Sequence, residues 1–489
     1  MVEKIGVGMK LSIPFGRTLA AAAILASAVV VPMASAPSPV AAAGCTWCAG
    51  GEFHALTPTR ILETRDNPAA VPPIVPINDT DLPGIKPLTP GNGVTFDVQV
   101  LGLAGVPASS SDVLAVAATI TVVNPTQPGY LGAYASGSPS VNSVLNFRAG
   151  QNVPNLAILR PGANGKVTIL LHDDATSAGT VHVLIDVSGW WSTSAYAATG
   201  TVDDGDERGA RLEAPATPGR IVDTRTPSSP VGPGGDLAVT VRGAKILNTQ
   251  TTIVPDDPNV VGVLINVTAV GPTATTYLSV VPDATSPGSP PTTSNLNLVT
   301  GQTKANTVLV PVGGDGKIHV YNANGNVQVL VDVMGVLVNG RTETTRLGRV
   351  VPLTSPFRAL DTRKAQWGAV PLGPGQAEDW SFASFANSVV ISTVAVGKQG
   401  ALLGNLTNAS LTRQYPTVGV DPSYLTVCPG TCPVNGQGFP TYSNLNSTET
   451  GPVPNMTLVP YGTNYAVRVF NQRGYSHYIL DVSAVVLAD

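Results

Sequence analysis

After residue 43, hydrophobic positions fall into short runs rather than into a helical repeat. The runs are rich in Val, Ile, Leu and Thr and are separated by clusters of Gly, Pro and Asn. Thr95–Val100 alternates polar and apolar side chains, which is typical of a sheet with one face in water. Val113–Val123 is almost wholly apolar or small, which is typical of a central strand. Because no helix-length window shows a 3.6-residue period, the pattern predicts an all-β protein.

The first third of the chain contains eight such runs, and the second third repeats the plan. Asn164-Gly165 and Asp315-Gly316 lie between consecutive runs and favour tight hairpins, because both residues of such a turn accept positive φ. In the first third, strands are predicted at Arg60–Thr64, Val94–Val100, Val113–Val123, Tyr130–Tyr134, Val144–Phe147, Leu156–Arg160, Val167–Leu171 and Val181–Val187. In the second third they include Val261–Val270, Tyr277–Val281, Thr307–Val312, Lys317–Tyr321 and Val327–Val333.

Three sequence markers recur three times in the same order. The first is TPTRILETR at 57–65, which returns as TPGRIVDTR at 217–225 and SPFRALDTR at 355–363. The second is S-x-L-N, followed nine residues later by another Asn in every copy, and the third is an Asp-Val pair within an apolar run. The markers predict homologous modules at 53–192, 213–339 and 350–489, joined by an acidic linker at 193–212 and a short linker at 340–349.

About eight strands in about 130 residues fit an antiparallel β-sandwich of the jelly-roll or immunoglobulin-like kind. We therefore predict three tandem sandwich modules, which agrees with a length of 489 residues and its prior of about three domains. The alternative is a single six-bladed β-propeller, because three units of eight strands could form six four-stranded blades.

The first 43 residues have the features of an export signal. Basic residues precede an apolar stretch at 18–31 and a run of small residues that ends at Ala43. We expect cleavage after Ala43, which leaves a cysteine-containing mature N-terminus at 44–52; whether Cys45 carries a lipid stays open. No later run of 18 apolar residues occurs, so the mature chain is predicted to lack an integral membrane span and to be secreted or held at the cell envelope.

The four cysteines form two local pairs, Cys45 with Cys48 and Cys428 with Cys432. Structural disulfides suit an exported protein, and Pro429-Gly430 can turn the chain between the second pair. Three pairings are possible. A zinc site and a redox C-x-x-C are alternatives, but the zinc-ligand spacing and a thioredoxin-like pattern are absent.

Composition and motifs restrict the function classes. A net charge of −4 and a pI near 5.7 argue against nucleic-acid binding. No G-x-S-x-G elbow, H-E-x-x-H motif or P-loop occurs. The sequence predicts no enzyme activity, no cofactor and no metal site.

The polar residues of the three markers form the largest candidate set. We expect them to tie strand ends together, because a folding requirement recurs in every module whereas a catalytic pair is usually needed once. The alternatives are a binding site repeated three times and a glycosidase pair, Glu63 with Asp186. The set comprises Arg60, Glu63, Arg65, Asn146, Asn155, Asp186, Arg220, Asp223, Arg225, Asn297, Asn306, Asp332, Arg358, Asp361, Arg363, Asn446, Asn455 and Asp481.

Trp190 and Trp191 are the candidate ligand-binding residues. They end the last predicted strand of module one, where neighbouring side chains face opposite ways. We expect one in the core and one exposed to a sugar. Tyr130, Tyr134 and Tyr277 are expected to pack on strands, and the Asn266-Val267-Thr268 sequon is expected to be buried.

The pattern T-P-x-R-[IL]-[LV]-D-T-R, N-V-T, Y-L-x-V, S-N-L-N, G-Q-x-x-x-N and D-V-x-G resembles a repeat in secreted proteins of actinomycetes and related bacteria. The resemblance covers nearly all of the mature chain, is best in module two, and is weakest in module three, where Ala484 replaces the last Gly. It implies an extracellular accessory. We therefore expect a structural or adhesive component of the cell envelope or extracellular space, with a cell-wall glycan or an envelope protein as partner. The alternatives are a multivalent polysaccharide-binding protein and a secreted hydrolase.

Overall fold

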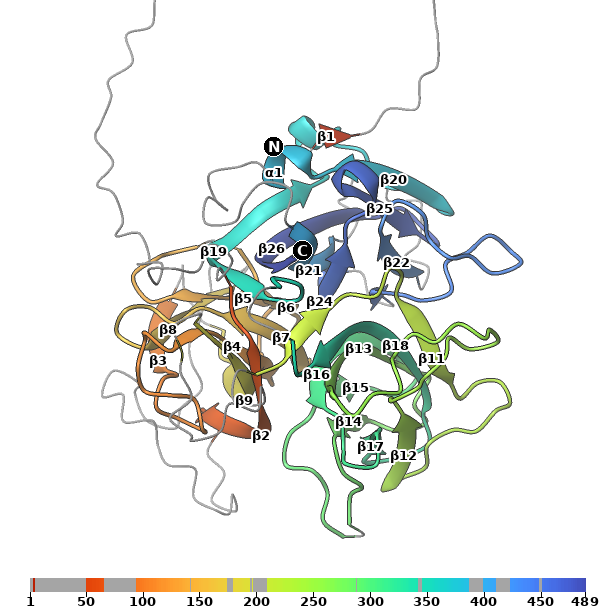
Figure 1. Ribbon diagram of the computed structural model, residues 1–489, viewed down its shortest axis with the longest axis horizontal. Coiled ribbons are helices and arrows are strands. Elements are labelled where there is room, and N and C mark those ends of the chain that lie inside the picture. Colours follow the sequence, from red (N-terminus) through yellow and green to blue (C-terminus); the bar gives the residue numbers. More distant parts are fainter. Residues whose placement is uncertain are drawn as a thin grey trace, which may run out of the picture.

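A computed structural model describes the parts of the chain that form the fold. These are residues 3–4, 50–65, 94–140, 142–173, 179–193, 196, 209–286, 288–341, 345–386, 399–409, 423–447 and 451–489. The regular secondary structure of the described chain is almost entirely antiparallel β-sheet and forms six sheets, two in each module. Figure 1 shows the modules as three lobes, orange to yellow, green, and cyan to blue, around a common centre.

Module one contains two four-stranded sheets. We call the sheet that faces the centre of the molecule the inner sheet and its partner the outer sheet. The inner sheet has the order β2 (Phe53–Glu63), β9 (His182–Ser192), β4 (Val113–Val123) and β7 (Val153–Leu159). The outer sheet has the order β3 (Val94–Gln99), β8 (Lys166–Asp173), β5 (Gly129–Ala135) and β6 (Leu145–Phe147). Each of the eight predicted strands corresponds to one of these.

Modules two and three repeat this order. The inner sheet of module two contains β10 (Arg211–Glu213), β18 (Gln328–Val338), β13 (Val260–Val270) and β16 (Thr303–Pro311), with β11 (Gly219–Asp223) also on β18. Its outer sheet contains β12 (Gly235–Thr240), β17 (Lys317–Asn322), β14 (Thr276–Val281) and β15 (Leu296–Leu298).

In module three the inner sheet contains β19 (Val350–Asp361), β26 (His477–Leu487), β21 (Gln399–Ala409) and β24 (Val453–Pro460). The outer sheet contains β1 (Glu3–Lys4), β20 (Gln376–Ser381), β25 (Ala466–Asn471), β22 (Ser423–Cys428) and β23 (Leu445–Ser447). Short helices lie at α1 (Ala383–Ala386), η2 (Ala365–Trp367) and η4 (Thr463–Tyr465).

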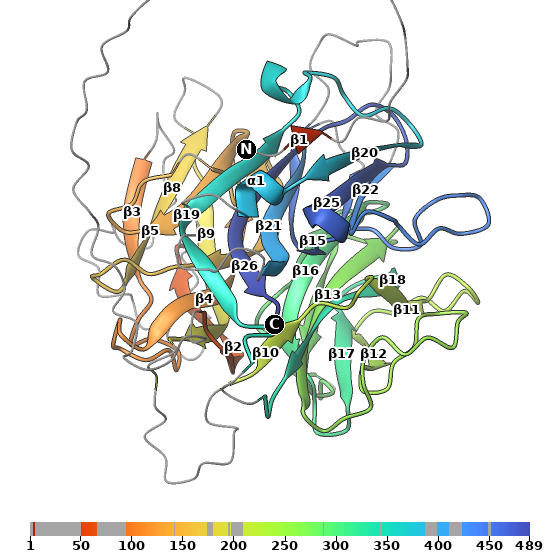
Figure 2. The ribbon, with the colours of Figure 1, turned by 45° about the horizontal axis from the view of Figure 1, so that its top comes forward.

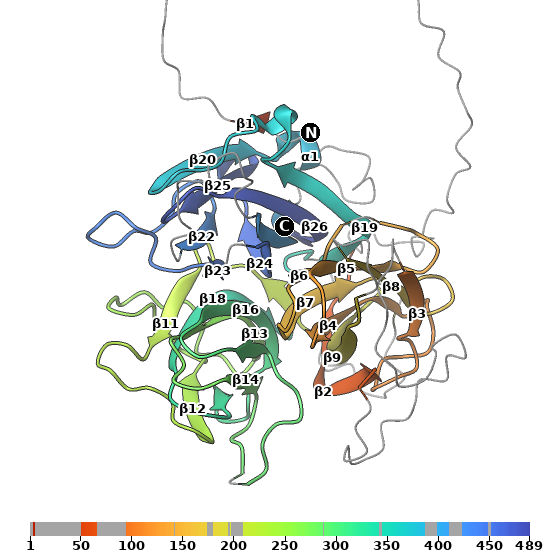
Figure 3. The same cartoon turned by 180° about the vertical axis from the view of Figure 1, so that it is seen from behind.

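The three modules are sandwiches, because each has a hydrophobic core drawn from both of its sheets. In module one, for example, Ile120 and Ile185 of the inner sheet pack in one cluster with Val98 and Ile169 of the outer sheet. Equivalent clusters fill modules two and three. The six sheets grouped around one centre resemble the six-bladed propeller considered as the alternative (Figure 3). The cores pair these sheets face to face as the sandwich prediction requires.

A fourth hydrophobic cluster lies where the three inner sheets meet. Phe53, Leu212 and Val350, the residues at the starts of the three inner sheets, belong to it, as do Trp191 and Leu458. The face of each inner sheet that points away from its own sandwich core is therefore buried against the other two modules rather than exposed to solvent. This central core explains why the predicted central strands are apolar on both faces.

The structure differs from the predicted division of the chain at two points. β1, which lies in the predicted signal segment 1–43, pairs with β20 of module three. β10 begins at Arg211, inside the predicted 193–212 linker, and pairs with β18 of module two. The sequence signal was hidden because Arg211 is charged, although it is buried. Apart from Glu3–Lys4, the predicted signal segment lies outside the described residues, as do Cys45, Cys48 and most of the acidic linker.

Candidate functional site

The first and third sequence markers form a row of four alternating charges on the inner sheet of module one. Arg60 binds Asp186 through two hydrogen bonds, Nε to Oδ1 at 2.8 Å and Nη2 to Oδ2 at 3.0 Å. The same guanidinium donates to Glu63 at 2.8 Å, and Glu63 accepts two side-chain hydrogen bonds from Arg65. We call this row, Asp186–Arg60–Glu63–Arg65, an ion-pair chain.

Modules two and three contain the same ion-pair chain. Arg220 binds Asp332 at 2.7 and 3.1 Å, and Arg358 binds Asp481 at 2.8 and 2.9 Å. The chains continue through Asp223 to Arg225 and through Asp361 to Arg363. Each ion-pair chain joins the strand that contains the first marker to the last strand of its module. The paired strands are β2 with β9, β11 with β18, and β19 with β26.

The local electrostatics favour ionised carboxylates in the middle of these chains. Burial alone would raise the pKa of Glu63, but hydrogen bonds from Arg65 and the charges of Arg65 and Arg60 hold it below its ordinary value. The pKa values of Asp223 and Asp361 are lowered in the same way against the effect of burial. Glu63 and Asp186, the candidate glycosidase pair, lie on either side of Arg60 and both bind it.

The threonine of the D-T-R marker has a separate role. Its hydroxyl accepts a hydrogen bond from a backbone amide of the last strand in each module: Thr64 from Val183, Thr224 from Val329, and Thr362 from Tyr478. These threonines are buried, so each bond satisfies a backbone donor that water cannot reach.

The second marker, S-x-L-N, forms a loop that is closed by side-chain hydrogen bonds, and an inner-sheet strand follows this loop. Asn146 donates to Ser143 Oγ and Asn297 to Ser294 Oγ, while Ser443 Oγ donates to Asn446 Oδ1. The Asn nine residues later donates to the backbone carbonyl of the second residue in the S-x-L-N loop. The donor and acceptor pairs are Asn155 with Val144, Asn306 with Asn295, and Asn455 with Asn444. The fixed spacing of nine therefore reflects a hydrogen bond across the connection from an outer-sheet strand to the inner-sheet strand that follows it.

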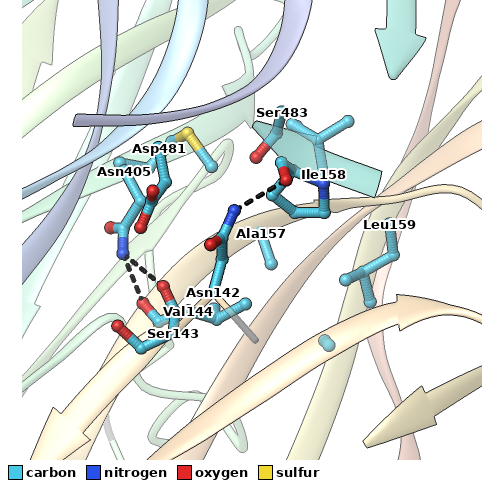
Figure 4. Close-up of a pocket in the computed structure, with 12 residues that line it drawn as sticks. Asn142, Ser143, Val144, Ala157, Ile158, Leu159, Asn405, Asp481 and Ser483 are labelled. Carbon is cyan, nitrogen blue, oxygen red and sulfur yellow. Dashed lines mark hydrogen bonds between the residues drawn. The ribbon is translucent and has the colours of Figure 1, made fainter. Parts of the chain in front are cut away.

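The S-x-L-N loop of module one lies against the ion-pair chain of module three. Asn405 of β21 donates to the carbonyls of Ser143 and Val144, both at 3.0 Å, and Asn142 donates to Pro356 O at 2.6 Å (Figure 4). A cavity of about 10 Å³, room for one water molecule, is lined here by residues that include Asn142, Asn405 and Asp481. The pocket is thus part of a seam between modules.

The S-x-L-N loop of module three lies against module two in the same manner. Asn266 of β13 donates to Ser443 O at 2.6 Å, and the amide of Ser443 donates to Asp332 at 3.3 Å. Asn455 accepts a hydrogen bond from the amide of Thr307 on β16 and donates to Asn266. At the third seam, β15 and β16 of module two contact β7 and β2 of module one.

The tryptophan prediction is wrong, because both side chains are buried. Trp190 is 4% exposed and packs in the core of module one, where it stacks on His54 with ring centroids 4.2 Å apart. Trp191 is 1% exposed and packs on Phe53 in the central core. Their side chains do face opposite ways, but neighbouring modules cover the face that was expected to be open. Neither ring offers a surface to a sugar.

The outer sheets instead carry half-buried aromatic rings at equivalent positions. Tyr130, Tyr277 and Tyr424 each pair with the final Asn of an S-x-L-N marker on the next strand. Each lies near a second ring on its sheet: Tyr130 with His172, Tyr277 with Tyr321, and Tyr424 with Phe470, at centroid distances of 4.9, 6.1 and 6.2 Å. From the sequence, Tyr130 and Tyr277 were expected only to pack on strands, and Tyr424 was not among the candidates.

The predicted Cys428–Cys432 disulfide is present, with its Cα atoms 5.4 Å apart. Cys428 ends β22, and both cysteines pack in the central core. Within the described ranges, no three His, Cys, Asp or Glu side chains are grouped so that they could hold a metal ion. The part of the chain that the structure describes contains no helix with the length and apolarity of a membrane span.

No family model matches the chain, and no curated protein matches it. Among solved structures it is similar to the N-terminal CBM22-1-CBM22-2 tandem domain from Paenibacillus barcinonensis Xyn10C, with 12% identity over 59% of this chain and 99% of that chain and a TM-score of 0.18. It is also similar to a protein described by its triple jelly roll fold and turret assembly in an archaeal virus, with 10% identity over 89% and 91% of the two chains and a TM-score of 0.16. A chain from the atomic structure of Sulfolobus Turreted Icosahedral Virus is similar as well, with 10% identity over 88% of this chain and 92% of that chain and a TM-score of 0.15.

Two of the seam residues escaped the candidate set although the sequence contained a signal for them. Asn266 and Asn405 occupy equivalent positions on β13 and β21, because they pair with Asp332 and Asp481 on the next strand. Asn266 was expected to be buried, and it is fully buried. The Asn-x-Thr sequence at 266–268 and 405–407 was the available signal. Module one has Thr119 at this position, so the pattern is incomplete.

Proposed function

We propose that the protein is an exported, non-catalytic component of the cell envelope or extracellular space with a structural or adhesive role. The observation that carries this proposal is the use of the repeated polar residues. In every module they bind one another, backbone groups or a neighbouring module, as with Arg60 on Asp186 and Asn455 on Thr307. Polar side chains that are bonded in this way stabilise the modules and the seams between them.

Two further features support an exported location. The Cys428–Cys432 disulfide suits an oxidising compartment, and the repeat resembles one in secreted bacterial proteins. The three modules pack around a shared core, which suits a protein that must persist outside the cell.

The first test is a binding and turnover assay on residues 44–489. The protein is incubated with peptidoglycan, mycolated wall and insoluble polysaccharides, and it is also crosslinked on intact actinomycete cells. We expect crosslinks to envelope protein and no release of soluble sugar. Sugar release that disappears in the Glu63→Gln and Asp186→Asn double variant would contradict a non-catalytic role. Release that survives the double variant would point to a contaminant and leave the proposal standing.

The second candidate is a multivalent polysaccharide-binding protein. The observation that favours it is the recurrence of half-buried Tyr130, Tyr277 and Tyr424 on the three outer sheets. Aromatic faces can stack on pyranose rings, and three weak sites on one chain can add avidity.

The tyrosine variants separate this candidate from the first. If the outer sheets bind glycan, Tyr130→Ala, Tyr277→Ala and Tyr424→Ala each weaken retention on the polysaccharide, and the triple variant loses it by at least a hundredfold. Tyr475→Ala is the matched control, because Tyr475 is 39% exposed but lies outside the outer sheets. Equal retention of the triple variant and the control would exclude this candidate.

A further inference from the structure

The starting segments of the three modules meet at one place and bind one another through their backbones (Figure 2). Gly51 and Val350 exchange two hydrogen bonds, at 2.8 and 3.0 Å, and Phe53 and Ala210 exchange two at 2.7 Å. The amide of Leu212 donates to Gly348 O at 2.8 Å. Module one is thereby bonded to modules three and two, and module two to module three.

A buried ion triad lies at this junction. Arg211 donates to Glu52 Oε1 through Nε at 2.9 Å and approaches it through Nη2 at 2.8 Å. Arg349 Nη2 donates to the same oxygen at 3.2 Å. The three side chains are 1%, 9% and 5% exposed for Arg211, Glu52 and Arg349. Arg211 Nη1 also donates to the carbonyls of Thr345 and Leu347 in the short linker.

The three charged residues occupy the same position in their modules. Each directly precedes Phe53, Leu212 or Val350, and these pair with Trp191, Leu337 and Val486, the equivalent residues of the last strands. Three copies of one charge at this place would repel one another in a site with little water. Here the single Glu52 binds both Arg211 and Arg349 instead, so closing the ring favours modules that differ at this position.

The seams also have a direction. The S-x-L-N loop of module one lies on module three, and that of module three lies on module two. Contacts of this head-to-tail kind close into a ring when the rotation between units permits it. We infer that the module is a ring-forming unit whose partner is another copy of the same module, and that Glu52, Arg211 and Arg349 lock the ring at three modules and fix their order.

The test is to cut the full chain once and ask whether the ring holds. A protease site is inserted between Gly200 and Thr201 in the predicted linker, and the C-terminal part carries an affinity tag. After cleavage at micromolar protein, we expect the fragment that contains module one to remain bound to modules two and three. Separation of the two fragments in the otherwise unchanged protein would overturn the inference.

Charge variants then test the triad itself. Glu52→Arg places three arginines at the junction and is expected to raise the dissociation constant of the cut fragments at least tenfold. Glu52→Arg with Arg349→Glu moves the carboxylate to module three, keeps the carbonyl bonds of Arg211, and is expected to restore binding to within threefold of the unchanged protein. Asp315→Arg, which makes the same charge change at a 53% exposed position, serves as the control and should have no effect.

The swap keeps the inference open to refutation even if Glu52→Arg fails to fold. If the double variant binds as weakly as the single variant, or also fails to fold, the triad does not lock the ring. If Asp315→Arg weakens binding as much as Glu52→Arg, the effect is one of net charge, and the inference is again wrong.

Discussion

At the scale of single residues, the same polar side chains occur in every module because their partners are backbone atoms or fixed charges of the same fold. Asn155 and Asn455 bind the carbonyl of an S-x-L-N loop, and Thr64 and Thr362 bind an amide of the last strand. A backbone partner does not change when the surrounding apolar residues change. The polar partner is therefore the part of each module that stays recognisable between repeats.

One residue outside this set should make stability depend on pH. Burial lowers the pKa of His54 from 6.5 to about 4, and its ring stacks on Trp190. Below pH 6.5 the unfolded chain binds a proton here that the folded chain refuses, so stability falls as the pH falls from 6.5 towards 4. We expect His54→Phe to remove roughly 2 kcal/mol of the loss measured by urea unfolding between pH 7 and pH 4.5. An unchanged pH dependence in the variant would show that other groups cause the loss.

At the scale of elements, the ion-pair chains join the marker strand to the last strand of each module, and their members differ in burial. Asp332 is fully buried and accepts hydrogen bonds from Arg220 and from the amide of Ser443. Asp223 is 19% exposed and binds Arg225, which is 47% exposed. The two carboxylates belong to one chain and carry the same charge, so they form a matched pair for mutation.

We expect Asp332→Ala to lower the free energy of unfolding by about 3–5 kcal/mol, because it leaves Arg220 half-buried without its main partner. Asp223→Ala should lower it by about 1 kcal/mol or less, because the exposed end of the chain is screened by water. Urea unfolding of both variants measures the difference. Equal losses would mean that burial does not set the strength of these chains.

The sequence was most informative about the strands. All eight strands of module one were predicted, because turns such as Asn164-Gly165 and the alternation in Thr95–Val100 are local signals. The expected hairpins at Asn164-Gly165 and Asp315-Gly316 were wrong, since each turn connects an inner-sheet strand to an outer-sheet strand with which it does not pair. The start of β10 was not predicted, because Arg211 is buried against groups distant in the sequence, Glu52 of module one and Thr345 of the short linker. The exposed tryptophan was predicted wrongly for the same reason. The sequence of a strand shows which face points away from its own core, but it does not show that a neighbouring module covers that face.

At the scale of the whole molecule, the central core belongs to all three modules at once. Gly189 and Gly335, the last residues of D-V-x-G, leave room for Phe53 and Leu212, since a Cβ would meet Phe53 Cζ at 2.1 Å and Leu212 Cδ1 at 2.9 Å. In module three, Ala484 replaces the glycine, and the residue equivalent to Phe53 is the smaller Val350. The departure of module three from the repeat is thus matched by a change in the residue it must accommodate.

A shared core has a consequence for unfolding. If one module unfolded alone, it would expose the inner-sheet faces of the other two, including Leu212, Met334 and Leu458, which are buried in the central cluster. Exposing that apolar surface is unfavourable by about 25 cal/mol for each Å², so the partly unfolded states should be sparsely populated. We expect scanning calorimetry of residues 44–489 to show one transition, with a van't Hoff enthalpy close to the calorimetric enthalpy. Three independent modules would instead give a van't Hoff enthalpy of about a third of the calorimetric value, and that result would falsify a single cooperative unit.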